Sequence, residues 1–146
     1  DSPIDEPGVV DVRILLQNGE LPTEEVVKLV LDALSADKVR PLTDLVRVSA
    51  PDTVPFNIDV TYYIPNPSAA SAANIERAAM EAVERYRVWQ TEKMGRDINP
   101  SYLTRLLMET GVKRVEIREP VFTKVEAKGV AVLQEKTILN GGVEDE

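Results

Sequence analysis

The fold is decided by residues 56–64, which read Phe56-Asn57-Ile58-Asp59-Val60-Thr61-Tyr62-Tyr63-Ile64. Every even-numbered side chain of this stretch is apolar, and every odd-numbered one is polar or a tyrosine. Successive side chains of a β-strand point to opposite faces, so the pattern predicts a strand with one buried and one polar face. The polar face would consist of Asn57, Asp59, Thr61 and Tyr63.

A long helix is predicted to follow this strand. Residues 65–68 contain two prolines that break the strand, and the alanine-rich segment 69–94 has apolar residues at helical spacing. Its expected inner face is formed by Ile75, Ala79, Ala82, Val83, Tyr86 and Gln90. A second, shorter helix is expected after Asn99, which can cap it, because Pro100 suits the first helical position.

The remaining elements complete an α+β pattern. Strands are expected near residues 10–16, 45–50, 113–119 and 129–139, and a helix over residues 22–36. The order contains the β-α-β-β-α-β frame of the ferredoxin-like arrangement, with an extra short helix and an extra C-terminal strand. We therefore predict an α+β fold with its helices on one face of a mostly antiparallel sheet.

The same pattern divides the chain into three parts. Residues 1–8, rich in proline and acids, read as a linker or arm, and residues 9–140 as one α+β domain. An arrangement of two small lobes meeting near residues 51–55 stays open. Residues 141–146 read as an acidic tail, expected to be disordered or to adhere to a neighbour.

Composition narrows the chemistry of this chain. Its 146 residues include no cysteine and no histidine, which removes thiolate chemistry and the usual general base and metal ligand. The net charge of −8 speaks against binding of nucleic acid, because phosphate groups are bound by clustered lysine and arginine. No apolar run approaches the roughly 20 residues of a membrane span. We expect no enzyme activity, and we expect the chain to bind no cofactor, metal, membrane or small-molecule substrate.

Three exposed features stand out as possible interaction surfaces. They are the polar strand face, the connector that holds Arg40 and Asp44, and the bridge between the two later helices with Arg96 and Asp97. Arginine is enriched at the centres of protein interfaces, so Arg40 and Arg96 are the expected anchors. The alternative is that these groups cap and brace their own loops.

The segment Leu34-Ser35-Ala36-Asp37-Lys38-Val39-Arg40-Pro41-Leu42-Thr43-Asp44, followed by Val46-Arg47-Val48, resembles the baseplate J-like proteins of contractile-tailed bacteriophages. Residues 54–60, 95–98, 111–115 and 141–142 fit the same pattern, so the resemblance runs from about Val10 to the end. It implies a structural piece of the baseplate wedge that binds other baseplate or tail proteins. It further implies a place in the virion tail baseplate, assembly in the bacterial cytoplasm, and no catalytic residues.

Two other classes of function stay open. One is a ferredoxin-like regulatory or small-molecule-binding domain. The other is a hydrolase that uses two carboxylates. A pocket between helices and sheet, lined by convergent polar groups, would favour the binding domain. Neighbouring genes for tail sheath and tube would favour the baseplate protein.

Overall fold

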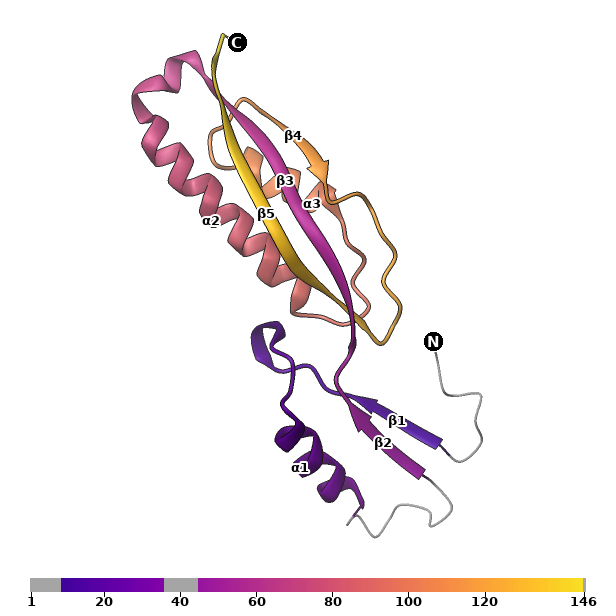
Figure 1. Ribbon diagram of the computed structural model, residues 1–146. Helices are drawn as coiled ribbons and strands as arrows, with labels where there is room; N and C mark the ends of the chain where they lie inside the picture. The colour runs from indigo at the N-terminus through magenta and orange to yellow at the C-terminus, as the bar shows by residue number, and fades with distance from the viewer. Residues whose placement is uncertain (1–8, 36–44, 146) are drawn as a thin grey trace.

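The computed structural model describes residues 9–35 and 45–145. They form two lobes, each with its own β-sheet, and the N-terminal lobe lies below the C-terminal one in Figure 1. The predicted arm over residues 1–8 lies outside the described residues. So does the connector with Arg40 and Asp44.

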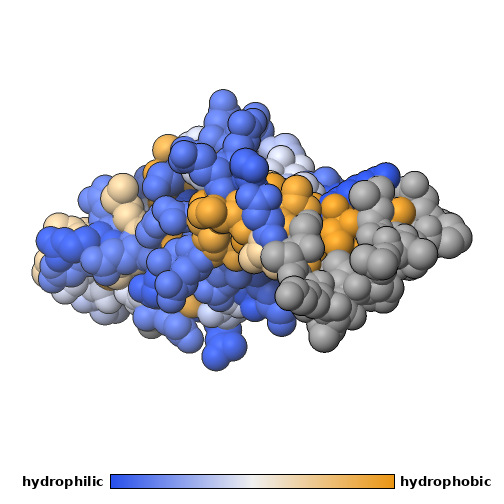
Figure 2. All heavy atoms as spheres, turned by 90° about the horizontal axis from the view of Figure 1, so that it is seen from below, coloured by the Kyte–Doolittle hydropathy of each residue, from blue (hydrophilic) through white to orange (hydrophobic). Residues whose placement is uncertain are grey.

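The N-terminal lobe is a small strand–helix–strand unit. Its strands β1 (Val9–Arg13) and β2 (Leu45–Ser49) pair in parallel, and helix α1 (Glu24–Ser35) lies between them in the chain. A short 3-10 turn, η2 (Gln17–Gly19), follows β1. The apolar side chains described in this lobe are all partly or largely exposed, and Figure 2 shows hydrophobic atoms at the surface of this end of the molecule.

The C-terminal lobe holds the rest of the secondary structure. In chain order its elements are β3 (Asp52–Pro65), η3 (Asn66–Ser71), α2 (Ala72–Thr91), α3 (Pro100–Met108), β4 (Arg114–Glu119) and β5 (Gly129–Glu144). The sheet order is β4-β3-β5, with β3 antiparallel to β4 and parallel to β5. Helices α2 and α3 lie on the same side of this sheet (Figure 1). The opposite side carries the polar residues of β3.

The core lies between β3 and the two helices, as the sequence predicts. The apolar face of β3 and the expected inner face of α2 are both buried, and so are the three leucines of α3. The residues concerned are Phe56, Ile58, Val60, Tyr62, Ile64, Ile75, Ala79, Ala82, Val83, Tyr86, Gln90, Leu103, Leu106 and Leu107. The predicted cap of α3 is also confirmed, since the Ser101 N–H donates to Asn99 Oδ1 at 3.0 Å.

The ferredoxin-like frame is not confirmed, because the strands form two separate sheets. Pro51 and Asp52 have the composition of a turn, yet the chain continues through them directly into β3, so β2 pairs with β1 alone. Both β1–β2 and β3–β5 are joined through helices, and such crossovers bring strands together in parallel. The expected mostly antiparallel sheet is therefore a mixed sheet beside a small parallel one.

The C-terminal end also differs from the prediction. Strand β5 extends to Glu144, so residues 141–144 belong to the sheet instead of an acidic tail. Gly142 has φ +104° and lies where the pairing with β3 shifts, which lets the strand continue past an irregular step. Beyond it, Val143 pairs with Ile64.

Polar and close backbone contacts join the two lobes. The Lys128 ammonium group lies 2.9 Å from the Asp11 carboxylate, and Arg13 lies 3.0 Å from Asp52. The turn η2 reaches the end of α2, where a β-carbon on Gly19 would overlap Thr91. The N-terminal lobe is thus attached to the C-terminal lobe through β1 and η2.

Candidate functional site

The polar face of β3 is the side of the sheet that faces away from the helices. Asn57, Asp59 and Tyr63 are partly exposed there, while Thr61 is only 8% exposed. Thr61 is covered by charged side chains from the neighbouring strand β4. We use the term polar sheet face for these β3 residues together with Arg114, Glu116 and Arg118 of β4.

At one end of the polar sheet face, Arg118 binds two side chains of β3. Its guanidinium donates to Asp59 Oδ1 at 2.9 Å and to Thr61 Oγ1 at 2.8 Å. The hydrogen bond from Arg118 holds the pKa of Asp59 below its ordinary value, and the same bond raises the pKa of Arg118. Both groups therefore stay charged at neutral pH, and Arg118 is held across the strand in one position.

At the other end, Arg114 lies over the Tyr63 ring, with its guanidinium carbon 3.8 Å from the ring centroid. It donates two hydrogen bonds to Glu144, at 2.9 and 2.8 Å, and a third to Glu116 at 3.0 Å. The Tyr63 hydroxyl donates to Glu116 at 3.2 Å. Residue 141 has to be glycine here, because a β-carbon would overlap the Tyr63 ring.

These contacts shift the pKa values of all three charged groups. Hydrogen bonds from Arg114 lower the pKa of Glu144 and, together with Tyr63, that of Glu116. The Glu144 bonds raise the pKa of Arg114. The result is a fixed pattern of alternating charges across three strands, with no free nucleophile or base among the groups that form it.

Asn57 takes part in the sheet rather than in this charged network. Its side-chain oxygen accepts a hydrogen bond from the Glu135 N–H at 3.2 Å, at the point where the pairing of β3 and β5 shifts. The amide therefore satisfies a backbone group that the irregular pairing would leave without a partner.

The predicted bridge residues Arg96 and Asp97 make contacts inside the protein. Arg96 donates to the Trp89 carbonyl at 2.5 Å and lies over the Trp89 ring, 4.3 Å from its centroid. Asp97 Oδ1 accepts from the Val125 N–H at 2.9 Å. Both side chains thus brace the loop between α2 and α3, and their role in binding a partner stays a prediction.

The structure adds residues that the sequence reasoning missed. Arg114, Glu116 and Arg118 complete the polar sheet face, and Glu144 joins them from β5. The signal was present in β4, where charged residues occupy every second position, as they do on one face of a strand. Glu144 could not be found because it was assigned to a tail.

Two of the surface hollows lie away from the polar sheet face, and a third, of about 200 Å³, is lined in part by Asn57. One of about 390 Å³ runs along α2, and one of about 360 Å³ lies beside Trp89 and Tyr102. Between α2 and the sheet, the space is filled by apolar core residues. Within residues 9–35 and 45–145, no acidic cluster is arranged to hold a metal ion, and no helix is long and apolar enough to cross a membrane.

Comparison with known proteins matches both lobes. Residues 2–50 match the Baseplate J-like central domain, and residues 56–139 match the Baseplate J-like protein C-terminal domain. The chain is also 32% identical over 117 residues to baseplate protein J of Escherichia phage P2. That alignment covers 79% of this chain and 37% of the relative, so the chain spans a little over a third of the relative's length.

Proposed function

The chain belongs to the Baseplate J-like family, and on that premise we propose that it is a structural component of a phage tail baseplate. In this proposal it works in the wedge of a contractile tail, through contacts with other baseplate or tail proteins. It binds no nucleic acid, membrane or small-molecule substrate, and it catalyses no reaction. The absence of histidine and cysteine from the sequence supports the last point.

The observation that carries the proposal is the asymmetry of the C-terminal sheet. One face is covered by α2 and α3, whereas the other carries an organised set of charged groups. Each arginine of this set is held by two or more side chains, so little side-chain entropy remains to be lost when a partner binds. Arginine and tyrosine, which lie together here as Arg114 and Tyr63, are both enriched among the residues that dominate the binding energy of protein interfaces.

We therefore propose the polar sheet face as the main contact surface, with Asp59, Thr61 and Tyr63 at its centre and Asn57 at its edge. A partner with a complementary alternation of charge would meet Arg118 and Asp59 at one end and Arg114 with Glu144 at the other. Contact roles for Arg40, Asp44, Arg96 and Asp97 belong to the same proposal. We also propose that the region first expected to span residues 9–140, and now extended to Glu144 by β5, acts as one unit built of two lobes.

The test is a charge reversal on the polar sheet face, made in the full-length protein. Arg118→Glu replaces a positive charge at one end of the polar sheet face by a negative one. Arg105→Glu on the outside of α3 is the matched control, since both arginines are exposed. We expect both variants to fold with nearly unchanged melting, because exposed ion pairs contribute less than about 1 kcal/mol. Only Arg118→Glu should block baseplate assembly, as counted by electron microscopy of particles. Normal assembly of a folded Arg118→Glu variant would contradict the proposal.

A further inference from the structure

The two edge strands of the C-terminal sheet differ in how well they are protected from pairing with another chain. Strand β4 is short, carries a charge at every second position and is followed by Pro120, all of which discourage strand addition. Strand β5 runs over 16 residues with no proline. From Thr137 to Val143 it has no charged residue.

The outer edge of β5 is open over most of its length. At its start the Gly129 carbonyl accepts from the Gly95 N–H at 2.9 Å. Past that point, β5 pairs with β3 and with no further strand among the described residues. Between two irregular steps, residues 135–140 pair evenly with residues 57–62, which makes this stretch a regular edge. Leu139 within it is 50% exposed.

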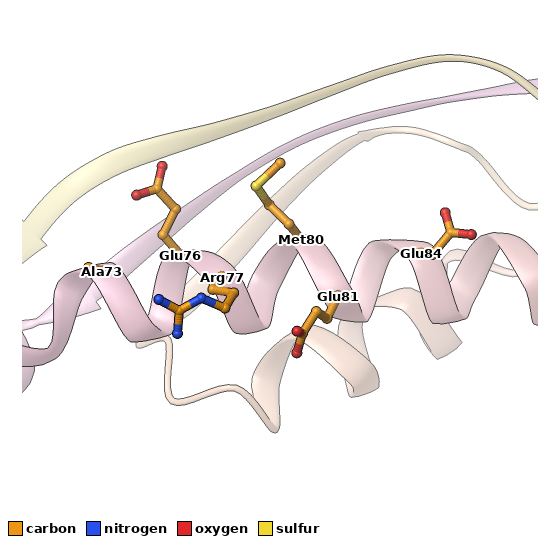
Figure 3. A pocket seen from close by; sticks show the side chains of 6 residues that line it. All are labelled: Ala73, Glu76, Arg77, Met80, Glu81 and Glu84. Atoms are coloured by element: carbon orange, nitrogen blue, oxygen red, sulfur yellow. The ribbon is translucent and has the colours of Figure 1, made fainter.

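A ridge of α2 runs beside this edge. Glu76, Met80 and Glu84 are spaced four residues apart, and Figure 3 shows their side chains pointing to the side on which β5 passes. They line the hollow of about 390 Å³, and Met80 is 52% exposed in it. The Glu84 carboxylate is paired with Arg87 at 2.6 Å, and Lys136 on β5 lies close enough to lower its pKa further. The ridge therefore runs alongside the regular stretch of β5.

The spacing of this ridge matches that of an extended chain. Four residues of helix rise about 6.0 Å, and two residues of a strand rise about 6.6–6.8 Å. A strand added to the edge of β5 would turn every second side chain towards α2. Three such side chains in a row would then meet Glu76, Met80 and Glu84 in turn.

We propose that the edge of β5 and the α2 ridge form a docking groove for an extended segment of another protein. The segment pairs with residues 135–140 and carries the pattern basic–x–apolar–x–basic. The basic residues face Glu76 and Glu84, and the apolar residue covers Met80. This inference rests on the proposed function, because it assigns a binding mode to one partner of the chain.

A second copy of the chain is not the occupant. Basic residues four positions apart occur twice in the sequence, as Arg114 with Arg118 and as Lys124 with Lys128. In both cases a glutamate stands midway, where Met80 would require an apolar side chain. Since no segment of these 146 residues has this short pattern, we propose a segment of a different protein as the occupant.

The experiment is a titration of the isotope-labelled chain with a short synthetic peptide, followed by NMR. The peptide carries arginine, valine and arginine at alternate positions among threonines, and the control peptide has the same composition in an order that breaks the pattern. We expect the first peptide to shift the backbone amides of residues 135–140 and the Met80 methyl group. Binding of both peptides alike, or shifts confined to other surfaces, would overturn the proposal.

Variants sharpen the result. Glu76→Lys should weaken binding of the patterned peptide by about fivefold, the upper range for one exposed ion pair. Glu109→Lys, at the C-cap of α3, is the control and should leave binding unchanged. Broadening of residues 135–140 that depends on protein concentration without peptide would instead mean self-association, and it would refute the proposal. Failure here leaves the assembly test of Arg118 unaffected, so the two proposals can fail separately.

Discussion

The two lobes of this chain solve the problem of burying apolar surface in different ways. In the C-terminal lobe, both helices cover one face of a three-stranded sheet, and Val60, Ala79 and Tyr86 are fully buried. In the N-terminal lobe, one helix accompanies two strands, and no apolar side chain that the structure describes there is buried. The comparison teaches that the C-terminal lobe is stable through its own core, whereas the N-terminal lobe depends on its attachments to the C-terminal one.

Elementary packing explains this difference. A two-stranded sheet with one helix is close to the lower limit of independent stability, and parallel strands are normally covered on both faces. The N-terminal lobe is attached by the ion pairs of Asp11 and Arg13 and by the close approach of Gly19 to α2. Contacts of this kind position a lobe but bury little apolar surface.

The largest expected effect is that of a charge placed in the C-terminal core. Val60→Asp should destabilise the protein by about 4 kcal/mol, because it buries an unpaired carboxylate. The same change at Val12, which is partly exposed in β1, should cost only about 1 kcal/mol. Urea denaturation followed by fluorescence of Trp89 on α2 measures the first loss, and hydrogen–deuterium exchange of the β1 amides measures the second. Equal losses at the two sites would contradict the comparison of the lobes.

The next effect concerns a buried amide. Gln90 donates to the Asp97 carbonyl at 2.9 Å and accepts from the Asn99 N–H at 3.1 Å. Gln90→Leu would leave both backbone groups without a partner, at a cost of about 3 kcal/mol in unfolding free energy. Urea denaturation followed by fluorescence of Trp89 measures this loss. Thr23→Ala, which removes one exposed cap from α1, should cost about 1 kcal/mol, as measured by hydrogen–deuterium exchange of the α1 amides. A smaller loss at Gln90 than at Thr23 would refute this assignment.

A third effect tests the joint between the lobes. Gly19 has φ +80° and lies against Thr91, so Gly19→Ala adds both strain and overlap, and we expect a loss of about 2–3 kcal/mol. Gly142→Ala also places alanine at positive φ but has open space around it, so it should cost only about 1–2 kcal/mol. Thermal melting of the two variants measures the difference. Gly19→Ala should in addition change the NMR signals of α2 near Thr91, which Gly142→Ala should leave alone.

The smallest effect is a dependence of stability on pH. The hydrogen bond from Lys128, followed by that from Arg13, lowers the pKa of Asp11 in the folded chain. A lowered folded pKa contributes stability above the unfolded value of about 3.9, and this contribution is lost as the pH falls through the folded pKa. Asp11→Asn should therefore lose about 1 kcal/mol at neutral pH and almost nothing in strong acid. Asp32→Asn, in an exposed helical pair, is the control and should change stability by less than about 0.5 kcal/mol at either pH.

The sequence predicted the interior of the C-terminal lobe better than its topology. The alternation of residues 56–64 and the helical spacing from Ile75 to Gln90 are local patterns, and each identifies a buried face directly. Which strand pairs with which depends on contacts between distant segments. Pro51 and Asp52 have the composition of a turn, yet the chain continues through them into β3. The single sheet of the prediction was wrong for that reason.

The candidate surface was predicted in part for a similar reason. Asp59, Thr61 and Tyr63 follow from the alternation of one strand, but Arg118 reaches them from β4, 57 residues beyond Thr61. Gly141 and Gly142 look like the end of a structured region. In the folded chain they form an irregular step that brings Glu144 to Arg114.

Hydrogen–deuterium exchange of the 146-residue chain tests the central claim, the different origin of stability in the two lobes, most directly. We expect the amides of β3 and α2 to exchange only through global unfolding. Those of β1, β2 and α1 should exchange at least about 100-fold faster, because their lobe can open while the C-terminal core stays intact. Equal protection of β1 and β3 would contradict the account, since it would mean that both lobes unfold only together.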